Sequence, residues 1–331
     1  MKISVAMCTY EGAPYLGEQL ASIAGQTRPP DELVVCDDCS GDATAGIVRE
    51  FAAAASFPVR LYVNDRNLGS TRNFEQAIGR CGGDLIALAD QDDVWHPDKL
   101  RRAEAALAGA PGAGAYFSDA EVVDEGLRPL GYTVWEFINF GPRQREAIGR
   151  GRAFEVLSVE NYVTGATLCF RSKFRRLVLP ITEFAAGRVL IHDGWIVLLI
   201  SAVADVVCDP QPLVKYRQHP GQQMGASAAA LERRAASAGG GRGGGARLEN
   251  FDLPALGQLA AVFGRLAEAD EFSPYKPDAL RMRSQFFHLR ARAGLPESRL
   301  SRLPTVLREL FSARYHRYSN GVLSAAKDLL L

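Results

Sequence analysis

The segment "DLIALADQDDVWHPDKL" (residues 84–100) decides the fold, because an apolar run typical of a buried strand leads directly into acidic residues. Asp90, Asp92 and Asp93 fall within four residues at the end of that run. Carboxylates this close together repel one another unless a cation joins them. The segment therefore predicts a strand whose carboxyl end carries a metal site. A solvated acidic loop is the simpler alternative.

The residues before this segment alternate between strand and helix patterns. Leu16, Leu20 and Ile23 have the spacing of one buried helix face, and a later helix opened by Ser70 repeats that pattern. Alternating units of this length imply parallel strands joined by right-handed crossovers. We therefore expect an α/β fold with a doubly wound, mostly parallel sheet, whose first strands lie at 2–7, 32–36, 59–63 and 84–89.

Polar residues also follow the earlier strands of the expected sheet. Asp37 and Asp38 come directly after the second strand, and Asn64 and Asp65 follow the third. Ligands of such sheets bind beyond the carboxyl ends of the strands. These residues and the acids at 90–93 should therefore open onto one edge of the sheet.

Composition excludes several classes of protein. Lys and Arg total 38 against 38 Asp and Glu, so no net positive charge would recruit nucleic acid. The N-terminus lacks the apolar core of a secretory signal. The most apolar stretch, residues 195–204, has about half of the ~18 residues that a spanning helix needs. We expect a cytoplasmic globular protein of about two domains.

Cys36 and Cys39 have the spacing of a redox or zinc motif. Asp37 and Asp38 lie between them and would raise a thiol pKa by charge repulsion, which disfavours a thiol oxidoreductase. A zinc site would need two more ligands, and the other cysteines show no second paired spacing. We therefore interpret the thiols as bystanders and Asp38 as the functional residue.

The pattern loosens after residue 110. Residues 239–245 read "GGGRGGG", the composition of a flexible linker. The chain beyond is helical by pattern and basic, and its last thirty residues mix apolar side chains with arginines. That end could lie on an anionic membrane surface or form a helical cap on the first domain. We expect a first domain at 1–225, with halves of about 1–110 and 111–225, a linker at 226–246, and a helical region at 247–331.

Four segments of the first hundred residues resemble the family 2 glycosyltransferases, which have the GT-A fold. In order they are "SVAMCTYEGAPYLGEQLASIAGQT", "ELVVCDDCSGDAT", "NLGSTRNFEQAI" and "DLIALADQDDVWHPDKL". The segments "HDGW" at 192 and "YRQHPGQQMG" at 216 are similar to the rhamnosyltransferase-like branch. The resemblance implies a nucleotide-sugar donor such as dTDP-L-rhamnose. It also implies a saccharide or lipid-linked saccharide acceptor in cell-surface polysaccharide synthesis, with the enzyme cytoplasmic or peripheral on the inner face of the membrane.

The resemblance assigns a nucleotide site to the strand ends. Tyr10 would stack on or flank the base, and Asp38 would accept the N–H of the base. A packed aromatic at the strand end is the alternative for Tyr10. The remaining residues implied to lie near the nucleoside and diphosphate are Thr9, Glu11, Asn67, Gly69, Asn73 and Asp90.

The family motif D-x-D matches Asp90 and Asp92, and Asp92 would be the direct ligand of Mg²⁺ or Mn²⁺. His219 would complete the metal or diphosphate site, although a lone histidine in a loop is more often surface decoration. Asp93 would help to position the sugar.

The resemblance makes Asp193 the base of inverting transfer, and its alternative is a helix N-cap. Trp195 would offer a face for sugar stacking. Gly165, Ala166 and Thr167 match an acceptor-side loop.

The predicted function is therefore metal-dependent inverting transfer of a sugar to a saccharide hydroxyl. A nucleotidyltransferase is one rival, but "CTYEGAPYL" after the first strand lacks the basic, glycine-rich loop that it would need. A catalytically inactive nucleotide-sugar-binding module is the other rival. Asp38, Asp90, Asp92 and Asp193 occurring together argue against it.

Overall fold

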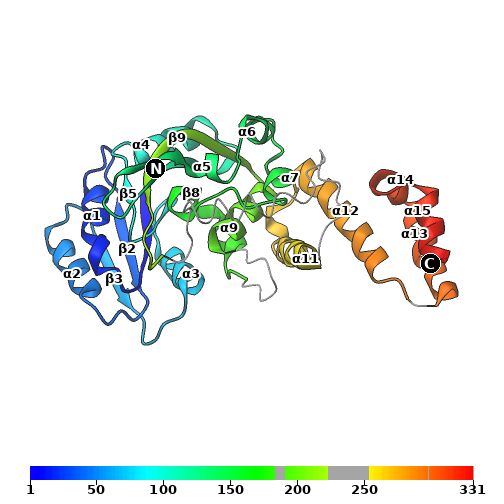
Figure 1. Cartoon of the computed structure of the whole chain (residues 1–331), viewed down its shortest axis with the longest axis horizontal. Coiled ribbons are helices and arrows are strands. Elements are labelled where there is room, and N and C mark those ends of the chain that lie inside the picture. The colour runs from blue at the N-terminus through cyan, green and yellow to red at the C-terminus, as the bar shows by residue number, and fades with distance from the viewer. Residues whose placement is uncertain (183–190, 223–252, 297, 331) are drawn as a thin grey trace.

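The computed structural model describes residues 1–182, 191–222, 253–296 and 298–330. One mixed sheet runs through the larger part of the molecule in the order β3-β2-β1-β4-β8-β6-β9-β5, and β7 pairs with β6 (Figure 1). The strands are β1 (Ile3–Thr9), β2 (Glu32–Asp37), β3 (Val59–Val63), β4 (Leu85–Ala89), β5 (Val94–Trp95), β6 (Ala113–Val123), β7 (Pro129–Thr133), β8 (Leu168–Arg171) and β9 (Asp205–Arg217).

The first four long strands form the parallel half that the sequence predicts. β1 pairs in parallel with β2 and β4, and β2 pairs in parallel with β3. The second half is mixed, because β8 inserts antiparallel between β4 and β6. The α/β prediction is confirmed, and its parallel character holds for β1 to β4.

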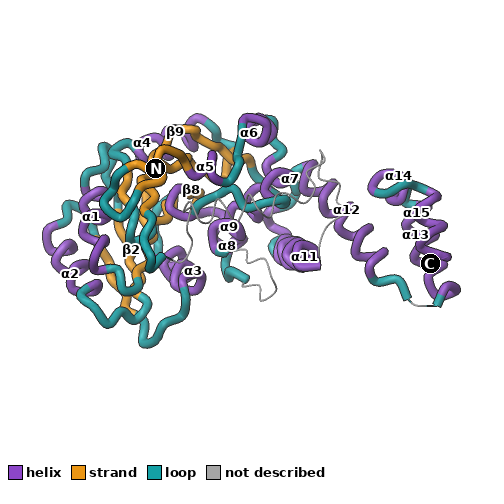
Figure 2. Tube along the Cα trace, viewed as in Figure 1, coloured by secondary structure: helices purple, strands orange, loops and turns teal. Residues whose placement is uncertain are grey.

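Helices cover both faces of the sheet (Figure 2). Leu16, Leu20 and Ile23 of α1 are buried on one face, as their spacing predicts, together with residues of α2 and α4. α3 and α9 contribute to the core on the other face. The helices of this part are α1 (Ala13–Ala24), α2 (Thr44–Ala54), α3 (Ser70–Arg80), α4 (Lys99–Gly109), α5 (Val134–Phe137), α6 (Pro142–Gly149), α7 (Ala153–Leu157), α8 (Arg175–Val178) and α9 (His192–Ser201).

The C-terminal helices fall into two groups. α11 (Leu253–Glu268) and α12 (Pro277–Ala293) extend the core beneath α9, where Phe263 contacts both Phe154 and Phe286. The other three helices have a small core of their own and lie beyond α12, away from the sheet (Figure 1). They are α13 (Arg299–Phe311), α14 (Arg314–Tyr318) and α15 (Val322–Leu330).

Two predictions about the second half need comment. The predicted linker at 226–246 lies outside the described residues. The alternative of a helical cap on the first domain describes α11 and α12, which pack against its core, whereas α13–α15 pack on one another and on α12. Among the described helices, none is both long and apolar enough to cross a membrane.

Candidate active site

The acids and their neighbours meet at the carboxyl edge of the parallel strands, as the sheet rule predicts. β1 ends at Thr9, β2 ends at Asp37, and β4 ends one residue before Asp90. β1 lies between β2 and β4 in the sheet, so the three strand ends are adjacent. This edge is the site described below.

Asp37 is an internal anchor of the edge. It is buried, and its Oδ2 accepts hydrogen bonds from Thr9 Oγ1 at 2.8 Å and Ser40 Oγ at 2.7 Å. Thr9 is buried as well, and its hydroxyl is committed to Asp37. The Thr9 side chain therefore stabilises the neighbouring strand end, and any contact of Thr9 with a nucleotide would have to come from its backbone.

Asp38 organises the loop between β3 and α3. Its Oδ1 accepts from Asn64 Nδ2 and from the Leu68 backbone N–H, both at 2.8 Å. Its Oδ2 accepts from the Gly69 backbone N–H at 2.8 Å. Gly69 has φ +84°, a left-handed conformation that glycine adopts without strain. Asp38 therefore holds the loop that was predicted to face the nucleotide.

The two asparagines of this loop region have different positions. Asn73 is buried, and its Nδ2 donates to the Cys36 carbonyl oxygen at 2.7 Å, so its side chain fixes α3 to the end of β2. Asn67 is exposed, and its side-chain Oδ1 accepts a hydrogen bond from the Gly69 N–H at 3.1 Å. Asn67 and Gly69 remain candidates for ligand contact, whereas Asn73 supports the loop from behind.

Tyr10 stands at the open edge of the site. Its side chain is 48% exposed, so it is not the packed strand-end aromatic of the alternative interpretation. The side-chain amide of Gln91 forms two hydrogen bonds with the backbone of Tyr10. Oε1 accepts from the Tyr10 N–H at 2.8 Å, and Nε2 donates to the Tyr10 carbonyl oxygen at 2.9 Å. Glu11 follows in a left-handed conformation, and its Oε1 accepts from the Gly41 N–H. The middle residue of the D-x-D motif thus fixes the position of Tyr10.

The three carboxylates at 90–93 differ in environment. Asp90 is half-buried, and desolvation raises the pKa of its carboxyl to about 7, with smaller contributions from the charges of Asp92 and Asp193. Asp93 is fully buried, and burial raises its pKa well above the usual value. Asp92 is also partly exposed, with 18% of its side chain open to solvent. Asp90 and Asp92 are thus the two carboxylates that a ligand can reach, whereas Asp93 is buried.

Arg217, the last residue of β9, is a buried hub behind these acids. Its backbone N–H donates to Asp93 Oδ1 at 3.1 Å, and its Nε donates to the Asp92 carbonyl oxygen at 2.7 Å. The same guanidinium donates to the Glu18 carboxylate and to the Glu125 carbonyl oxygen. Arg217 therefore fixes the backbone of the acidic loop.

His219 does not decorate the surface. Its Nε2 lies 2.8 Å from Asp92 Oδ2, and its ring packs on Tyr15 with centroids 4.5 Å apart. The Tyr15 hydroxyl donates to Glu125 Oε1 at 2.6 Å, which fixes the tyrosine. The structure thus brings His219 and Asp92 together.

The donor chemistry of this pair fits a divalent cation. No group of three His, Cys, Asp or Glu side chains suited to a metal occurs within the described ranges of the chain. Asp92 and His219 nevertheless offer an oxygen and a nitrogen at one point. Mg²⁺ is commonly held by one or two carboxylates with water and substrate phosphates supplying the other ligands. A cation here would share that pattern.

Asp193 is buried in the first turn of α9, where Ile191 and not Asp193 is the N-cap residue. Its Oδ1 accepts from Asn161 Nδ2 at 2.9 Å, and its carboxylate also accepts the Gly165 and Gly194 backbone N–H groups. Desolvation raises the pKa of Asp193 to about 6, although these hydrogen bonds oppose the rise. Such a carboxyl can change protonation near neutral pH.

A single 3₁₀ turn, Gly165–Thr167, connects Asp193 with the acidic loop. The backbone N–H of Gly165 lowers the pKa of Asp193, and the backbone N–H of the adjacent Ala166 lowers the pKa of Asp90. A Cβ atom on Gly165 would lie 2.8 Å from His192 Nε2, so the close approach requires glycine. The predicted acceptor loop therefore lies next to both acids.

The predicted stacking of a sugar on Trp195 is wrong. Trp195 is 0% exposed, and its Nε1 donates to the Val178 carbonyl oxygen at 2.8 Å, so its ring belongs to the core and presents no face to a sugar. The Thr167 hydroxyl is also buried and donates to the Thr164 carbonyl oxygen. Proximity to Asp193 in the sequence does not imply exposure, because every residue of α9 is buried.

Sequence reasoning missed four residues that shape the site: Gln91, Lys99, Asn161 and Arg217. Lys99 is buried with its Nζ 3.7 Å from the centroid of the Trp95 ring, and its positive charge acts on Asp90 and Asp93. Gln91 and Arg217 were visible inside quoted motifs, but their roles depend on distant partners. Asn161 carries no local signal, because it meets Asp193 from 32 residues away.

The cysteines take no part in this geometry. All six are free thiols, Cys36 is buried at the end of β2, and Cys39 is exposed in the following turn. Burial raises the pKa of Cys36 to about 11, which disfavours the thiolate.

Comparison with known proteins gives a consistent result. Residues 4–158 match the description "Glycosyl transferase family 2". The chain is 26% identical over 231 residues to the dTDP-rhamnosyl transferase RfbG of Shigella flexneri, across 67% of this chain and 74% of that protein. It is 25% identical over 219 residues to an uncharacterized protein of Mycobacterium tuberculosis, and the match spans 59% of that relative's length.

A solved structure is similar in fold. The structure of S. aureus TarS 1–349 in complex with UDP-GlcNAc superposes with a TM-score of 0.53 at 16% sequence identity, and the match covers 86% of this chain and 70% of the TarS chain. The fold is thus of the GT-A type.

Proposed function

We propose, from the premise that residues 4–158 form a family 2 glycosyltransferase domain, that this chain is a metal-dependent inverting glycosyltransferase. One observation carries the proposal. Two consecutive backbone N–H groups of a single turn act on the two acids: that of Gly165 lowers the pKa of the buried carboxyl of Asp193, and that of Ala166 lowers the pKa of the D-x-D residue Asp90. An acid at the diphosphate side and a base at the acceptor side are what direct transfer between two bound substrates needs.

Asp193 is the proposed base. Its carboxylate takes the proton of the acceptor hydroxyl as that oxygen bonds to the anomeric carbon. The bond from the anomeric carbon to the diphosphate breaks on the opposite face, and the nucleoside diphosphate leaves with the electron pair. Asn161 and the Gly165 N–H hold the carboxylate in one orientation.

Asp92 and His219 would hold the divalent cation, either Mg²⁺ or Mn²⁺. When bound, such a cation neutralises the charge that develops on the leaving diphosphate. Arg217 supports this function by fixing the backbone of Asp92 and Asp93.

The nucleotide would lie over the ends of β1 and β2. Tyr10 offers an exposed ring there, and Asp38 uses three of about four acceptor positions on loop groups, which leaves one for the N–H of a base. Backbone near Gly69 would approach the nucleoside closely.

The finer assignments concern substrates. L-Rhamnose from dTDP-L-rhamnose is the proposed donor, supported by the similarity to the Shigella flexneri enzyme. The proposed acceptor is a saccharide or lipid-linked saccharide of a cell-surface polysaccharide, met in the cytoplasm at the inner face of the membrane. A panel of nucleotide sugars, read by thermal shift with and without Mn²⁺, tests the donor: dTDP-rhamnose should stabilise the fold most.

The base assignment is tested by the pH profile of turnover. Because Asp193 has a pKa of about 6, the wild-type rate should fall about tenfold per pH unit below 6. Asp193→Asn should lose ~10² to 10⁴-fold or more in turnover, keep its affinity for the donor, and lose the part of the acid limb that Asp193 contributes, while Asp90, with its pKa raised to about 7, still titrates. Asp270→Asn, an exposed acid far from the site, is the matched control and should behave as wild type.

The outcomes separate the candidate functions. Near-normal turnover of Asp193→Asn would remove that residue from the mechanism. Donor stabilisation without transfer to any acceptor, in the wild type as in the variant, would instead support a nucleotide-sugar-binding module.

A further inference from the structure

α13 carries an apolar stripe that no other described part of the chain covers. Leu300, Leu303, Leu307 and Phe311 recur at the spacing of one helix face, and Leu300 and Phe311 are each 85% exposed. The opposite part of the same helix is already used, because Val306 is buried against α14 and α15. α13 therefore has an inner apolar face that holds its bundle together and an outer one that faces solvent.

The neighbouring helix repeats this arrangement. Ala325 of α15 is buried in the small core, while Val322, Leu323 and Leu330 of the same helix are exposed. Single exposed apolar residues are ordinary, but stripes on two packed helices mark a surface for an apolar partner. We call the residues of the two stripes the outer stripe residues.

The charge around these stripes has one sign. Residues 299–331 contain six Lys and Arg against two acids, and both acids turn inward. Glu309 is 1% exposed and bonds to His288 and Arg314. Asp328 is bonded by Arg292 and Tyr315.

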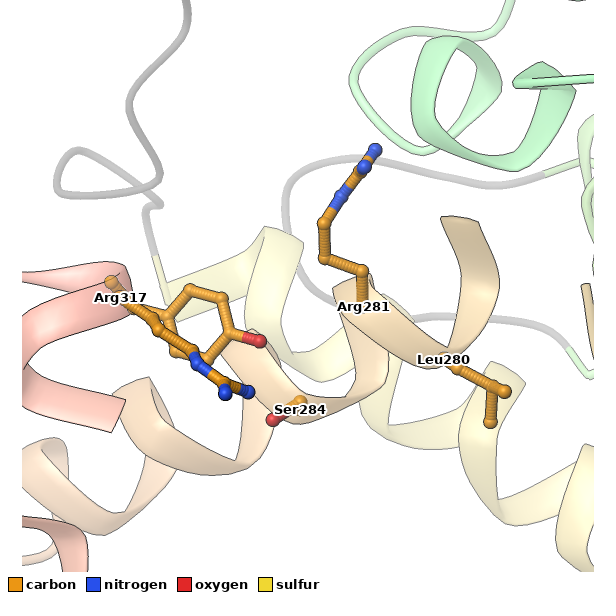
Figure 3. A pocket seen from close by; sticks show the side chains of 5 residues that line it. Leu280, Arg281, Ser284 and Arg317 are labelled. Atoms are coloured by element: carbon orange, nitrogen blue, oxygen red, sulfur yellow. The ribbon is translucent and has the colours of Figure 1, made fainter. Parts of the chain in front are cut away.

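Several of the cations are available to a partner. Within the described part of the chain, Arg299, Arg317 and Lys327 form no ion pair. Arg317 also lines a groove between α12 and α14 beside the hydroxyls of Ser284 and Tyr318, the kind of groups that bind a phosphate (Figure 3).

We propose that the outer stripe residues of α13 and α15 form a docking surface for an anionic lipid bilayer. An apolar helix face flanked by cations lies in the interface of such a bilayer, with its apolar side among the acyl chains and its arginines near the phosphates. A second copy of the chain fits less well, because it would oppose two surfaces of the same positive sign. The inference is independent of glycosyl transfer, since vesicle binding requires no donor.

The test is co-sedimentation of the full chain with vesicles. Wild type should bind vesicles made of phosphatidylglycerol and phosphatidylcholine, and it should bind pure phosphatidylcholine vesicles at least about tenfold less. The bound protein should be released as the salt concentration rises.

Variants of the stripe test which residues make the contact. Leu300→Ser with Phe311→Ser should weaken binding by at least about tenfold, since both residues are exposed and their loss removes only apolar contact. Arg299→Glu with Arg308→Glu should do the same by reversing the charge. Leu130→Ser, an exposed leucine on β7, is the matched control and should bind as wild type.

Three results would overturn the proposal. Wild type that stays in the supernatant with anionic vesicles would do so, and so would stripe variants that bind as tightly as wild type. The third is a dimer in size-exclusion chromatography that the Leu300→Ser, Phe311→Ser variant converts to a monomer, because the stripe would then be a self-association face. The thermal unfolding midpoint of each variant, measured without donor, shows that the fold is intact and keeps this test separate from that of the transferase activity.

Discussion

At the scale of single residues, Asp38 and its flanking cysteines give a direct test of which side chain matters at the end of β2. Asp38→Ala removes the acceptor of the Leu68 and Gly69 N–H groups and should weaken nucleotide-sugar binding by roughly 1 to 3 kcal/mol. The double change Cys36→Ser, Cys39→Ser should leave that affinity unchanged. Isothermal titration with the stabilising donor measures both.

The opposite pattern would count against the site. If the cysteine variant lost donor affinity and Asp38→Ala kept it, the thiols and not the carboxylate would form the binding edge. Asp37→Ala is unsuitable as a control, because its partners Thr9 and Ser40 are part of the same strand end.

His192 makes a separate prediction about stability and pH. Both of its ring nitrogens are buried without a hydrogen-bond partner, its ring stacks on Phe74 at 4.0 Å, and burial lowers its pKa from 6.5 to about 3. Between pH 6.5 and 3, His192 is therefore protonated in the unfolded chain and neutral in the folded chain. Its contribution makes the fold less stable as the pH falls through that range.

A difference measurement isolates this effect from the carboxylates nearby. The free energy of unfolding of His192→Met minus that of wild type should be about 2 kcal/mol larger at pH 5 than at pH 8. The reason is that methionine takes up no proton in either state. Urea unfolding of both proteins at pH 8, 6 and 5 gives the comparison. A stability difference that does not change with pH would mean that His192 is already hydrogen-bonded or protonated in the folded chain.

Residue types and strand ends allowed part of the site to be predicted. Asp38, Asp90 and Asp92 lie at the sheet edge, because a parallel sheet sends every strand end to the same side. Trp195 could not be placed in this way. α9 is buried on all sides, so adjacency to Asp193 along the chain says nothing about exposure.

At the scale of elements, the turn after β1 and the acidic loop are joined by one side chain, Gln91. Gly12 allows the contact: a Cβ atom there would lie 2.2 Å from Gln91 Oε1. Gly12→Ala should therefore displace the Gln91 amide, release Tyr10 and weaken donor binding about tenfold, with little change in the free energy of unfolding.

A second glycine supplies the control. Gly17 lies inside α1, and a Cβ atom there would meet nothing within 4 Å. Gly17→Ala should raise the free energy of unfolding by about 0.5 to 1 kcal/mol and leave donor binding unchanged. Urea unfolding and donor titration read both variants. Equal donor affinity in the two variants would show that the Gln91 clasp has no part in binding.

The parallel elements were predictable and the mixed ones were not, for a physical reason. In the first half each strand and its helix form a local unit with its own hydrophobic period, and the helix predicted to open at Ser70 begins there. In the second half β8 pairs with β4 and β6, which lie far away along the chain, and the pattern of four residues carries no direction. Asn161 and Arg217 were missed for the same reason, because the residues that they contact lie far away in the sequence.

At the scale of the whole molecule, the main core does not end with the sheet. Phe263 of α11 and Phe286 of α12 are buried in the same cluster as α9, and the Lys276 N–H donates to the Ala202 carbonyl oxygen between them. The sequence boundary at 225 followed the glycine-rich linker, and composition could not reveal that the chain returns to fill the core. α13–α15 are the part that stands apart.

A truncation series follows from this division. A chain that ends at Gly294 keeps α11 and α12 and should unfold cooperatively in urea near the wild-type midpoint, with donor stabilisation retained. A chain that ends at residue 225 loses the side chains that close the main core and should show no cooperative transition.

Point variants of the full chain test the same division. Phe263→Ala should lower the free energy of unfolding by about 3 to 5 kcal/mol, because it leaves a cavity in the core. Phe311→Ala, the same change at an 85% exposed position, should stay within about 0.5 kcal/mol of wild type. Tryptophan fluorescence reads these transitions, because all three tryptophans lie before residue 225. A 1–225 chain that unfolds as cooperatively as the 1–294 chain would place the domain boundary at the linker after all, and α11 and α12 would then be an attachment to the core and not a part of it.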